Sequence, residues 1–137
     1  MDWTLEVVVL PVSDVDRAKA FYSEQLGFAV DVDRRMSEQM RVVQLTPPGS
    51  GCSITIGEGL TAVAPGTYQG LQLCVSDIQA AHSQLAGHGV AVSEIFHFGE
   101  NGQQPGPGGP WNSFVSFSDP DGNGWVVQEA PADRGQR

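Results

Sequence analysis

The chain has 137 residues and a formal net charge of −9, from 7 basic and 16 acidic residues. This length predicts one domain with a buried core, and the acidic charge argues against nucleic acid or an anionic membrane surface as a partner, since clustered Lys and Arg hold both. No apolar run is long enough to cross a bilayer, the start does not resemble a signal peptide, and two cysteines allow at most one disulfide. We expect a soluble, cytoplasmic protein.

The first half of the chain predicts a strand, a helix and three further strands. Residues 4–12 are rich in β-branched residues and contain the start of LPVSDV, after which apolar residues recur with helical spacing as far as Gly27. Ser13 and Asp16 have the spacing of a capping box, which satisfies the free amides of a first helical turn. Strand-like runs then follow at residues 28–33, 40–45 and 53–57.

The second half repeats this order. LCVSDI begins at residue 73, 63 residues after LPVSDV begins at residue 10. Ser76 and Gln79 predict a second capping box, and Gly87 or Gly89 ends the second helix. Its strands are predicted at residues 71–75, 90–96, 113–117 and 125–129.

The repeat predicts an α+β domain made of two βαβββ modules. A single module would leave one face of its sheet exposed to water, so the two modules must pack or pair. We place module one at about residues 4–57, a linker at 58–67, module two at 68–130 and a tail at 131–137.

The stretch DPDGNG, residues 119–124, has the first part of a calcium-binding EF-hand loop. The bidentate glutamate that such a loop requires is displaced, because Glu129 comes one position early and Ala130 occupies the required place. A strand-like run also follows, where an EF-hand would have a helix. We therefore interpret DPDGNG as a chain reversal whose acidic residues serve the turn.

The order of elements, the two VSDV/VSDI helix starts, FYSEQLGF and DPDGNGW resemble the vicinal oxygen chelate superfamily, which includes glyoxalase I, extradiol dioxygenases and bleomycin-binding resistance proteins. The resemblance extends from about Leu5 to Glu129. It implies two modules forming a curved mixed sheet around a pocket, and a homodimer. It also implies a divalent metal held by His or Glu on the first and last strand of each module. Counting from the motifs places those positions at Val7, Thr55, Gly70 and Val126, a set without carboxylate, imidazole or thiolate; we expect no metal or other cofactor.

The alternation of strand side chains predicts what lines such a pocket. Val7, Thr55, Val126 and Gln128 point inward, as do Gln72 and Cys74 if Gly70 does. The long loop 98–111 is expected to be a binding lid or disordered, and it is flanked by Phe96, Phe98 and Trp111. These side chains suit a small hydrophobic or aromatic ligand. The alternatives are that the polar groups satisfy one another or bind water, and that Trp111 is a core residue.

The function predicted on this basis is metal-free binding of a small molecule, such as sequestration of an antibiotic or a hydrophobic metabolite in a resistance protein. The alternative is a glyoxalase-, dioxygenase- or isomerase-like enzyme with an atypical metal site or none. In that case the best candidates are His97 and Glu100, as an acid–base pair, and Glu129. Glu129 lies on the last strand, where it is expected to face solvent or cap an edge. A third alternative is a partner-binding or vestigial module whose main role is to form its dimer.

Overall fold

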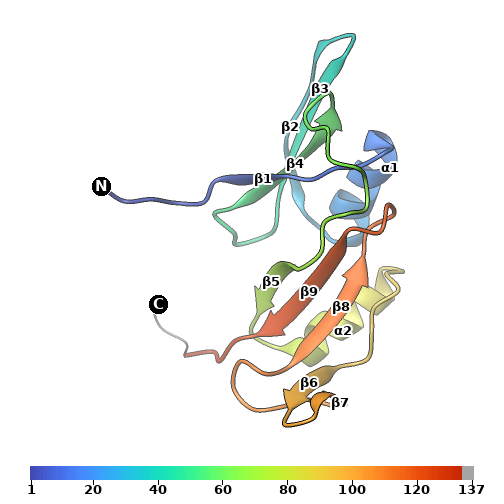
Figure 1. The fold of residues 1–137 in the computed structure, drawn as a ribbon. Coiled ribbons are helices and arrows are strands. Elements are labelled where there is room, and N and C mark those ends of the chain that lie inside the picture. Colours follow the sequence, from blue (N-terminus) through green and yellow to red (C-terminus); the bar gives the residue numbers. More distant parts are fainter. Residues whose placement is uncertain (134–137) are drawn as a thin grey trace. The chain divides into compact units, whose positions relative to one another are not determined.

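The computed structural model describes residues 1–133, and these form two compact units (Figure 1). Unit 1 comprises residues 1–68 with 119–123, and unit 2 comprises residues 69–118 with the described residues from 124 onward. Residues 134–137 of the predicted tail lie outside the described residues. Each unit contains a strand, a helix and then further strands, three in unit 1 and four in unit 2. The predicted α+β class with two repeated modules is confirmed, and unit 2 has one strand more than the βαβββ pattern.

The sheet of unit 1 is mixed. Its strand order is β1-β4-β3-β2, with β1 parallel to β4 and the other pairs antiparallel. The predicted first strand, residues 4–12, is mostly outside the sheet, because only three of its residues pair with β4. The bounds are β1 (Val7–Val9), β2 (Ala29–Ser37), β3 (Met40–Thr46) and β4 (Ser53–Glu58).

The helix of unit 1 is α1 (Val15–Ala20), which continues as the π-helical segment η1 (Phe21–Gln25). Its N-cap is Asp14, whose carboxylate accepts a hydrogen bond from the Arg17 amide at 3.0 Å. The capping box predicted from Ser13 and Asp16 is therefore wrong by one residue, since a short Asp side chain next to Ser serves the same purpose. Apolar residues of the helix pack on the sheet, and the buried set includes Ala18, Tyr22, Val43, Leu45, Ile54 and Ile56.

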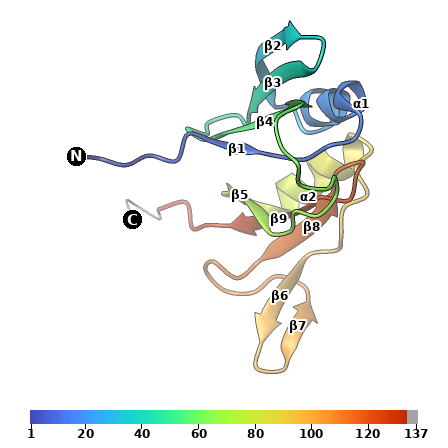
Figure 2. The same cartoon turned by 45° about the horizontal axis from the view of Figure 1, so that its top comes forward.

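The sheet of unit 2 is also mixed, with the order β5-β9-β8-β6-β7. Only β5 and β9 are parallel. Figure 2 shows the β6–β7 hairpin at the end of this sheet. The bounds are β5 (Leu71–Val75), β6 (Phe96–Gly99), β7 (Gly102–Pro105), β8 (Phe114–Ser118) and β9 (Gly124–Glu129).

The helix of unit 2 is α2 (Ile78–Gly87), and two carboxylates hold its first turn. Asp77 accepts from the Ala80 amide at 3.0 Å, and Glu129 accepts from the Ile78 amide at 2.8 Å. The capping box predicted from Ser76 and Gln79 is again displaced by one residue. Gly89, with φ of 82°, follows the helix end, as one of the two predicted glycines.

Two segments of unit 2 differ from the sequence prediction. Residues 90–95 are not a strand, although the Ser93 amide donates to the Ser116 carbonyl at 2.9 Å alongside β8. The predicted long loop 98–111 contains strand β7, because Glu100 and Asn101 form a two-residue hairpin turn and Gly102 follows with a positive φ of 95°. Among residues 1–133, no helix is both long enough and apolar enough to cross a membrane.

The turn DPDGN, residues 119–123, belongs to unit 1 and is held by a buried carboxylate. Asp119 is 5% exposed and accepts four hydrogen bonds of 2.8–2.9 Å, from the Tyr22 hydroxyl, the amides of Asp121 and Asn123, and the Asn123 side chain. The Asn123 side chain also donates to the Pro11 carbonyl at 2.8 Å and accepts from the Tyr68 amide at 3.1 Å. The carboxylate oxygens of Asp119 are therefore committed to the turn rather than offered to a metal.

The second acidic residue of the turn binds the start of α1. The Asp121 carboxylate accepts from both the amide and the hydroxyl of Ser13, and from the Arg17 guanidinium at 3.4 Å. The interpretation of DPDGNG as a turn whose acidic residues have a structural role therefore agrees with the contacts of both side chains.

We predict that Asp119→Ala lowers the free energy of unfolding by about 2–4 kcal/mol, because it leaves buried donors without an acceptor. Tyr22→Phe removes one hydrogen bond to a charged group and is expected to cost about 1.5–3 kcal/mol. Urea titration at neutral pH measures both, with the exposed Asp2→Ala as the control. A rise in the urea midpoint of the wild-type protein on adding Ca²⁺ would contradict this assignment of the turn.

Candidate functional site

The candidate site lies on one face of the unit 2 sheet. Helix α2 contacts β8 and β9 on the other face, where Val115, Trp125 and Val127 are buried. Alternate side chains point away from the helix to what we name the open face. Strand pairing places these residues on it: Gln72, Cys74, Phe96, Phe98, Phe114, Ser116, Val126 and Gln128. Six of the predicted ligand contacts therefore share one surface.

Three phenylalanine rings form an aromatic cluster on the open face. Phe96 lies opposite Phe114 in the sheet, with ring centroids 5.7 Å apart and nearly parallel planes. Phe98 packs edge-on against both rings, at 5.8 and 5.3 Å. Phe96 is buried beneath its neighbours, whereas Phe98 is 53% exposed. The cluster thus presents an aromatic surface of the kind that binds flat apolar molecules.

Amide side chains lie beside this cluster. The Gln72 side chain donates to the Gln128 carbonyl oxygen at 2.6 Å, and the Gln128 side chain donates to the backbone carbonyl of Trp111 at 2.8 Å. Gln72 and Gln128 therefore satisfy each other in part, which was one of the two alternatives. The Gln72 carbonyl oxygen makes no hydrogen bond among the described residues, so the pair still presents an acceptor.

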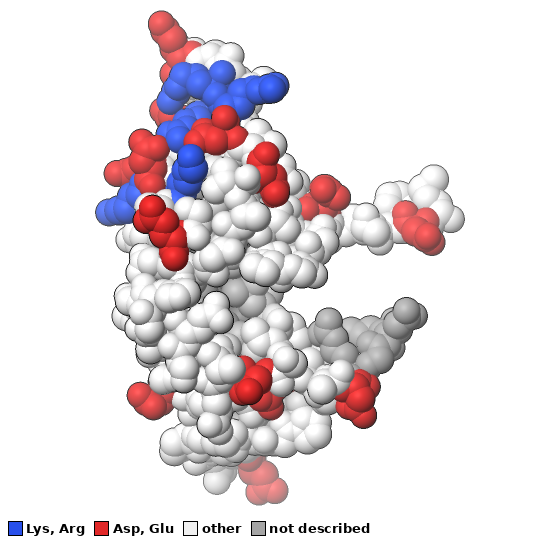
Figure 3. Space-filling model, turned by 180° about the vertical axis from the view of Figure 1, so that it is seen from behind, with Lys and Arg blue, Asp and Glu red and all other residues white. Residues whose placement is uncertain are grey.

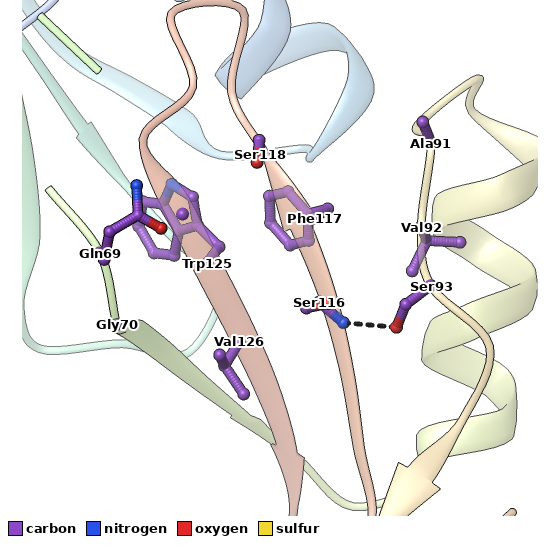
Figure 4. Close-up of a pocket in the computed structure, with 11 residues that line it drawn as sticks. Gln69, Gly70, Ala91, Val92, Ser93, Ser116, Phe117, Ser118, Trp125 and Val126 are labelled. Carbon is purple, nitrogen blue, oxygen red and sulfur yellow. Dashed lines mark hydrogen bonds between the residues drawn. The ribbon is translucent and has the colours of Figure 1, made fainter. Parts of the chain in front are cut away.

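A pocket of about 640 Å³ lies at the Gly124 end of the same sheet (Figure 4). Its lining includes Gln69, Ser93, Ser116 and Val126. Figure 4 shows the rings of Phe117 and Trp125 side by side there; they stack with centroids 6.1 Å apart. The Gln69 amide lies over Gly124, because a Cβ atom at that glycine would come within 2.1 Å of the Gln69 oxygen.

The remaining predicted contacts, Val7 and Thr55, lie in unit 1. Thr55 is opposite Val9 on one side and Gln44 on the other, so these residues and Val7 share the face of the sheet away from Ile54 and Ile56. Arg34 lies opposite Val42 on that same face. Sequence reasoning missed this exposed cation, because it considered only β1 and β4 in unit 1.

The four positions that correspond to metal ligands have little to offer a divalent ion. Of Val7, Thr55, Gly70 and Val126, only Thr55 has a side-chain oxygen, and Gly70 precedes β5 with φ of 81°. Divalent metals in this type of site require imidazole, carboxylate or thiolate donors. Within residues 1–133, no group of three or more His, Cys, Asp or Glu side chains is arranged to hold a metal. The residues at these positions therefore cannot provide the ligands that bind a divalent metal in enzymes of the superfamily that the sequence resembles.

The candidate acid–base residues are not arranged as a pair. His97 alternates with Phe96 and Phe98 along β6, and its Nδ1 is 2.8 Å from the Gly106 carbonyl oxygen, to which it must donate. Glu100 is exposed in the β6–β7 turn, and residues 1–133 contain no ion pair between it and His97. Glu129, expected to face solvent or cap an edge, holds the first turn of α2 instead.

Two functional candidates were missed from the sequence. Phe114 completes the aromatic cluster, and alternation along the strand predicted at 113–117 contained the signal. Asn112 makes two hydrogen bonds with Phe98, and nothing in the sequence indicates them. Trp111 is half-buried and is the only non-glycine residue of 1–133 with a positive φ, 63°. Cys74 is exposed on the open face and forms no disulfide within residues 1–133.

Charge is distributed unequally between the units. Every Lys and Arg within residues 1–133 lies in residues 17–41 of unit 1, where Figure 3 shows them gathered and interleaved with acidic residues. Asp33 accepts hydrogen bonds from Arg41 at 3.0 and 3.1 Å and from Lys19 at 2.7 Å. These hydrogen bonds, that of Arg41 first, hold the pKa of Asp33 well below its usual range. Unit 2 has no such cations among its described residues, so its open face favours neutral or cationic ligands.

Comparison with known proteins identifies one superfamily and several similar proteins. The family model of the Glyoxalase/Bleomycin resistance protein/Dioxygenase superfamily matches residues 4–127. TnmS3, an antibiotic binding protein from Streptomyces sp. CB03234, has a similar crystal structure, with a TM-score of 0.76 and 31% identity over 94% of this chain and 97% of TnmS3. A superfamily member from Sphaerobacter thermophilus DSM 20745 has a TM-score of 0.74 and 29% identity over 93% and 98% of the two chains. The uncharacterized protein YetH of Bacillus subtilis (strain 168) is 27% identical over 125 residues, 89% of this chain and 94% of YetH.

We predict that Asp33→Asn lowers the free energy of unfolding at pH 7 by less than about 1 kcal/mol, since the ion pairs are partly exposed. The folded-state pKa of Asp33 is depressed, so its contribution is complete above the unfolded pKa of about 4 and is lost as the pH falls further. Urea titrations of wild type and variant at pH 7 and pH 3 test this. A stability difference that grows on acidification would contradict it.

Proposed function

The chain belongs to the Glyoxalase/Bleomycin resistance protein/Dioxygenase superfamily, and on that premise we propose that it is a metal-free binding protein for small aromatic molecules. Its role would be to sequester an antibiotic or a hydrophobic metabolite by surface contact. The observation that carries the proposal is the cluster of Phe96, Phe98 and Phe114 on the open face, with Phe98 half exposed beside an amide pair. The likeness to an antibiotic binding protein at 31% identity adds support.

Contact with the three phenylalanine rings provides a substantial part of the free energy needed to bind an aromatic ligand. Covering the exposed half of the Phe98 ring is worth roughly 1 kcal/mol, and a favourable ring–ring contact adds about 0.5–1.5 kcal/mol. The Gln72 oxygen offers a hydrogen bond that orients the ligand, while the surrounding apolar surface supplies most of the affinity. A neutral or cationic planar molecule with a hydrogen-bond donor at its edge fits these features best.

The residues at the metal-ligand positions support a binding protein rather than a metal-dependent enzyme. Three of the four corresponding ligand positions carry Val or Gly, and the Nδ1 atom of His97 is committed to a backbone carbonyl. Glu129 holds the start of α2.

The proposal also includes a homodimer and a cytoplasmic location. Light scattering during gel filtration tests whether the protein is a dimer.

The proposal is tested by titrating the purified protein with N-phenyl-1-naphthylamine, a neutral fluorescent aromatic amine, and with a panel of neutral and cationic planar antibiotics. We expect at least one dissociation constant on the order of 10 μM or below. Phe98→Ala is expected to weaken binding roughly tenfold, through lost contact area. Trp3→Ala removes an exposed aromatic residue outside the unit 2 sheet and serves as the matched control.

Three results would contradict the proposal. The first is the absence of saturable binding by any compound of the panel, and the second is equal weakening of binding by Phe98→Ala and Trp3→Ala. The third is a divalent transition metal at one equivalent per chain in elemental analysis of gently purified protein, which would overturn the metal-free part.

A further inference from the structure

The hydrogen-bonded ladder between β6 and β8 is unusually short. Phe96 and Phe114 are its one pair of opposed residues. Continuing the antiparallel register by two residues along each chain places Phe98 opposite Asn112. The backbone does not pair there, because Trp111 has a positive φ of 63° and the Asn112 amide instead donates to the Gly109 carbonyl at 3.0 Å.

The Asn112 side chain supplies the missing pairing. Its oxygen accepts from the Phe98 amide at 2.9 Å, and its nitrogen donates to the Phe98 carbonyl at 2.9 Å. One primary amide thus satisfies both backbone groups of Phe98, as an opposed strand residue would. The two bonds also determine the orientation of the amide, since reversing it would place donor against donor and acceptor against acceptor.

This pairing has a direct consequence for the aromatic cluster. The β6–β7 hairpin is an edge of the sheet, and Phe98 lies beyond the last backbone pair that joins the hairpin to β8. The hydrogen bonds at the hairpin base include the Gly106 amide with the Ile95 carbonyl, His97 with the Gly106 carbonyl, and the Gly108 amide with the Ser113 hydroxyl, and none of them involves the backbone of Phe98. Asn112 is therefore the attachment that holds Phe98 at its distance of 5.3 Å from Phe114.

The far side of the same loop is anchored on the open face. Gln128 donates to the carbonyl of Trp111, the residue before Asn112, and Gln72 donates to Gln128. A continuous series of hydrogen bonds thus runs from β5 through β9 and the loop to the backbone of Phe98. Side chains that sequence reasoning assigned to the ligand hold the loop that carries Asn112.

We infer that Asn112 is a positioning residue of the binding surface, whose side chain takes the place of a strand residue and holds the Phe98 ring over Phe114. This inference rests on the proposed function for its biological meaning, but the placement of the ring is measurable without any ligand. Asn112 itself does not contact the ligand and acts through Phe98.

The test uses the full chain with three variants. Asn112→Ala removes both hydrogen bonds, and Asn112→Asp keeps the acceptor for the Phe98 amide but loses the donor. Asn101→Ala removes an exposed asparagine from the turn of the same hairpin and is the matched control. Urea titration of each variant establishes that it is folded; if Asn112→Ala does not fold, the isosteric Asn112→Asp carries the test.

NMR spectroscopy with labelled phenylalanine provides the ligand-independent measurement. Wild type and Asn101→Ala are expected to show nuclear Overhauser effects between the rings of Phe98 and Phe114, and slow exchange of the Phe98 amide. In Asn112→Ala the ring contacts should be lost and the amide should exchange freely. In Asn112→Asp the ring contacts should weaken while the amide stays protected, because its acceptor remains.

Binding of N-phenyl-1-naphthylamine gives the functional measurement. Asn112→Ala is expected to weaken binding about as much as Phe98→Ala does, roughly tenfold, with no further loss in the double variant. Ring contacts that persist in Asn112→Ala, or a Phe98 amide that stays protected there, would overturn the inference. If the ring contacts are lost as expected but wild type binds no aromatic compound, the proposed function fails while the positioning role of Asn112 stands.

Discussion

The structure of unit 1 depends on one buried carboxylate. Asp119 accepts four hydrogen bonds, from a tyrosine hydroxyl of the η1 segment, two backbone amides and an asparagine side chain. A charge in a buried position is tolerated only when its oxygens are satisfied in this way. The turn that contains it lies between β8 and β9 along the chain, yet its contacts place it in unit 1. The residues that resemble a calcium-binding loop therefore stabilise the structure of unit 1.

Several acidic side chains make structural contacts, so the open face of unit 2 presents aromatic and amide groups instead of carboxylates. Asp121 and Glu129 hold the starts of α1 and α2, and Asp33 pairs with Arg41 and Lys19. What the open face of unit 2 presents is an aromatic cluster, two amides and a thiol. Such a surface has few groups suited to acid–base chemistry, but it has the contact area and directed polar groups that recognise a flat organic molecule.

The binding surface also shows how side chains replace backbone pairing. The left-handed backbone at Trp111 interrupts the ladder between β6 and β8, and Asn112 restores its hydrogen bonds to Phe98 through an amide. Interruptions of this kind near a sheet edge re-aim the side chains that follow. Here the result is an exposed ring held against two others. Gln128 and Gln72, on the same face, hold the loop that carries Asn112.

The sequence by itself determined the two βαβββ modules, the superfamily and the shared face of Gln72, Cys74, Val126 and Gln128, because the repeat of VSDV and the two-residue period of strands are local patterns. It also identified 119–123 as a turn from its composition. The N-caps were misplaced by one residue, because Ser and Asp stand side by side and either can cap a helix. The Asn-Gly pair at residues 101–102 favours a hairpin turn, and the sequence prediction did not use this local signal. Only the tertiary structure decided that Asn112 pairs with Phe98 and Asp119 with Tyr22, since those partners are 14 and 97 residues apart and no local pattern encodes which distant donor meets which acceptor.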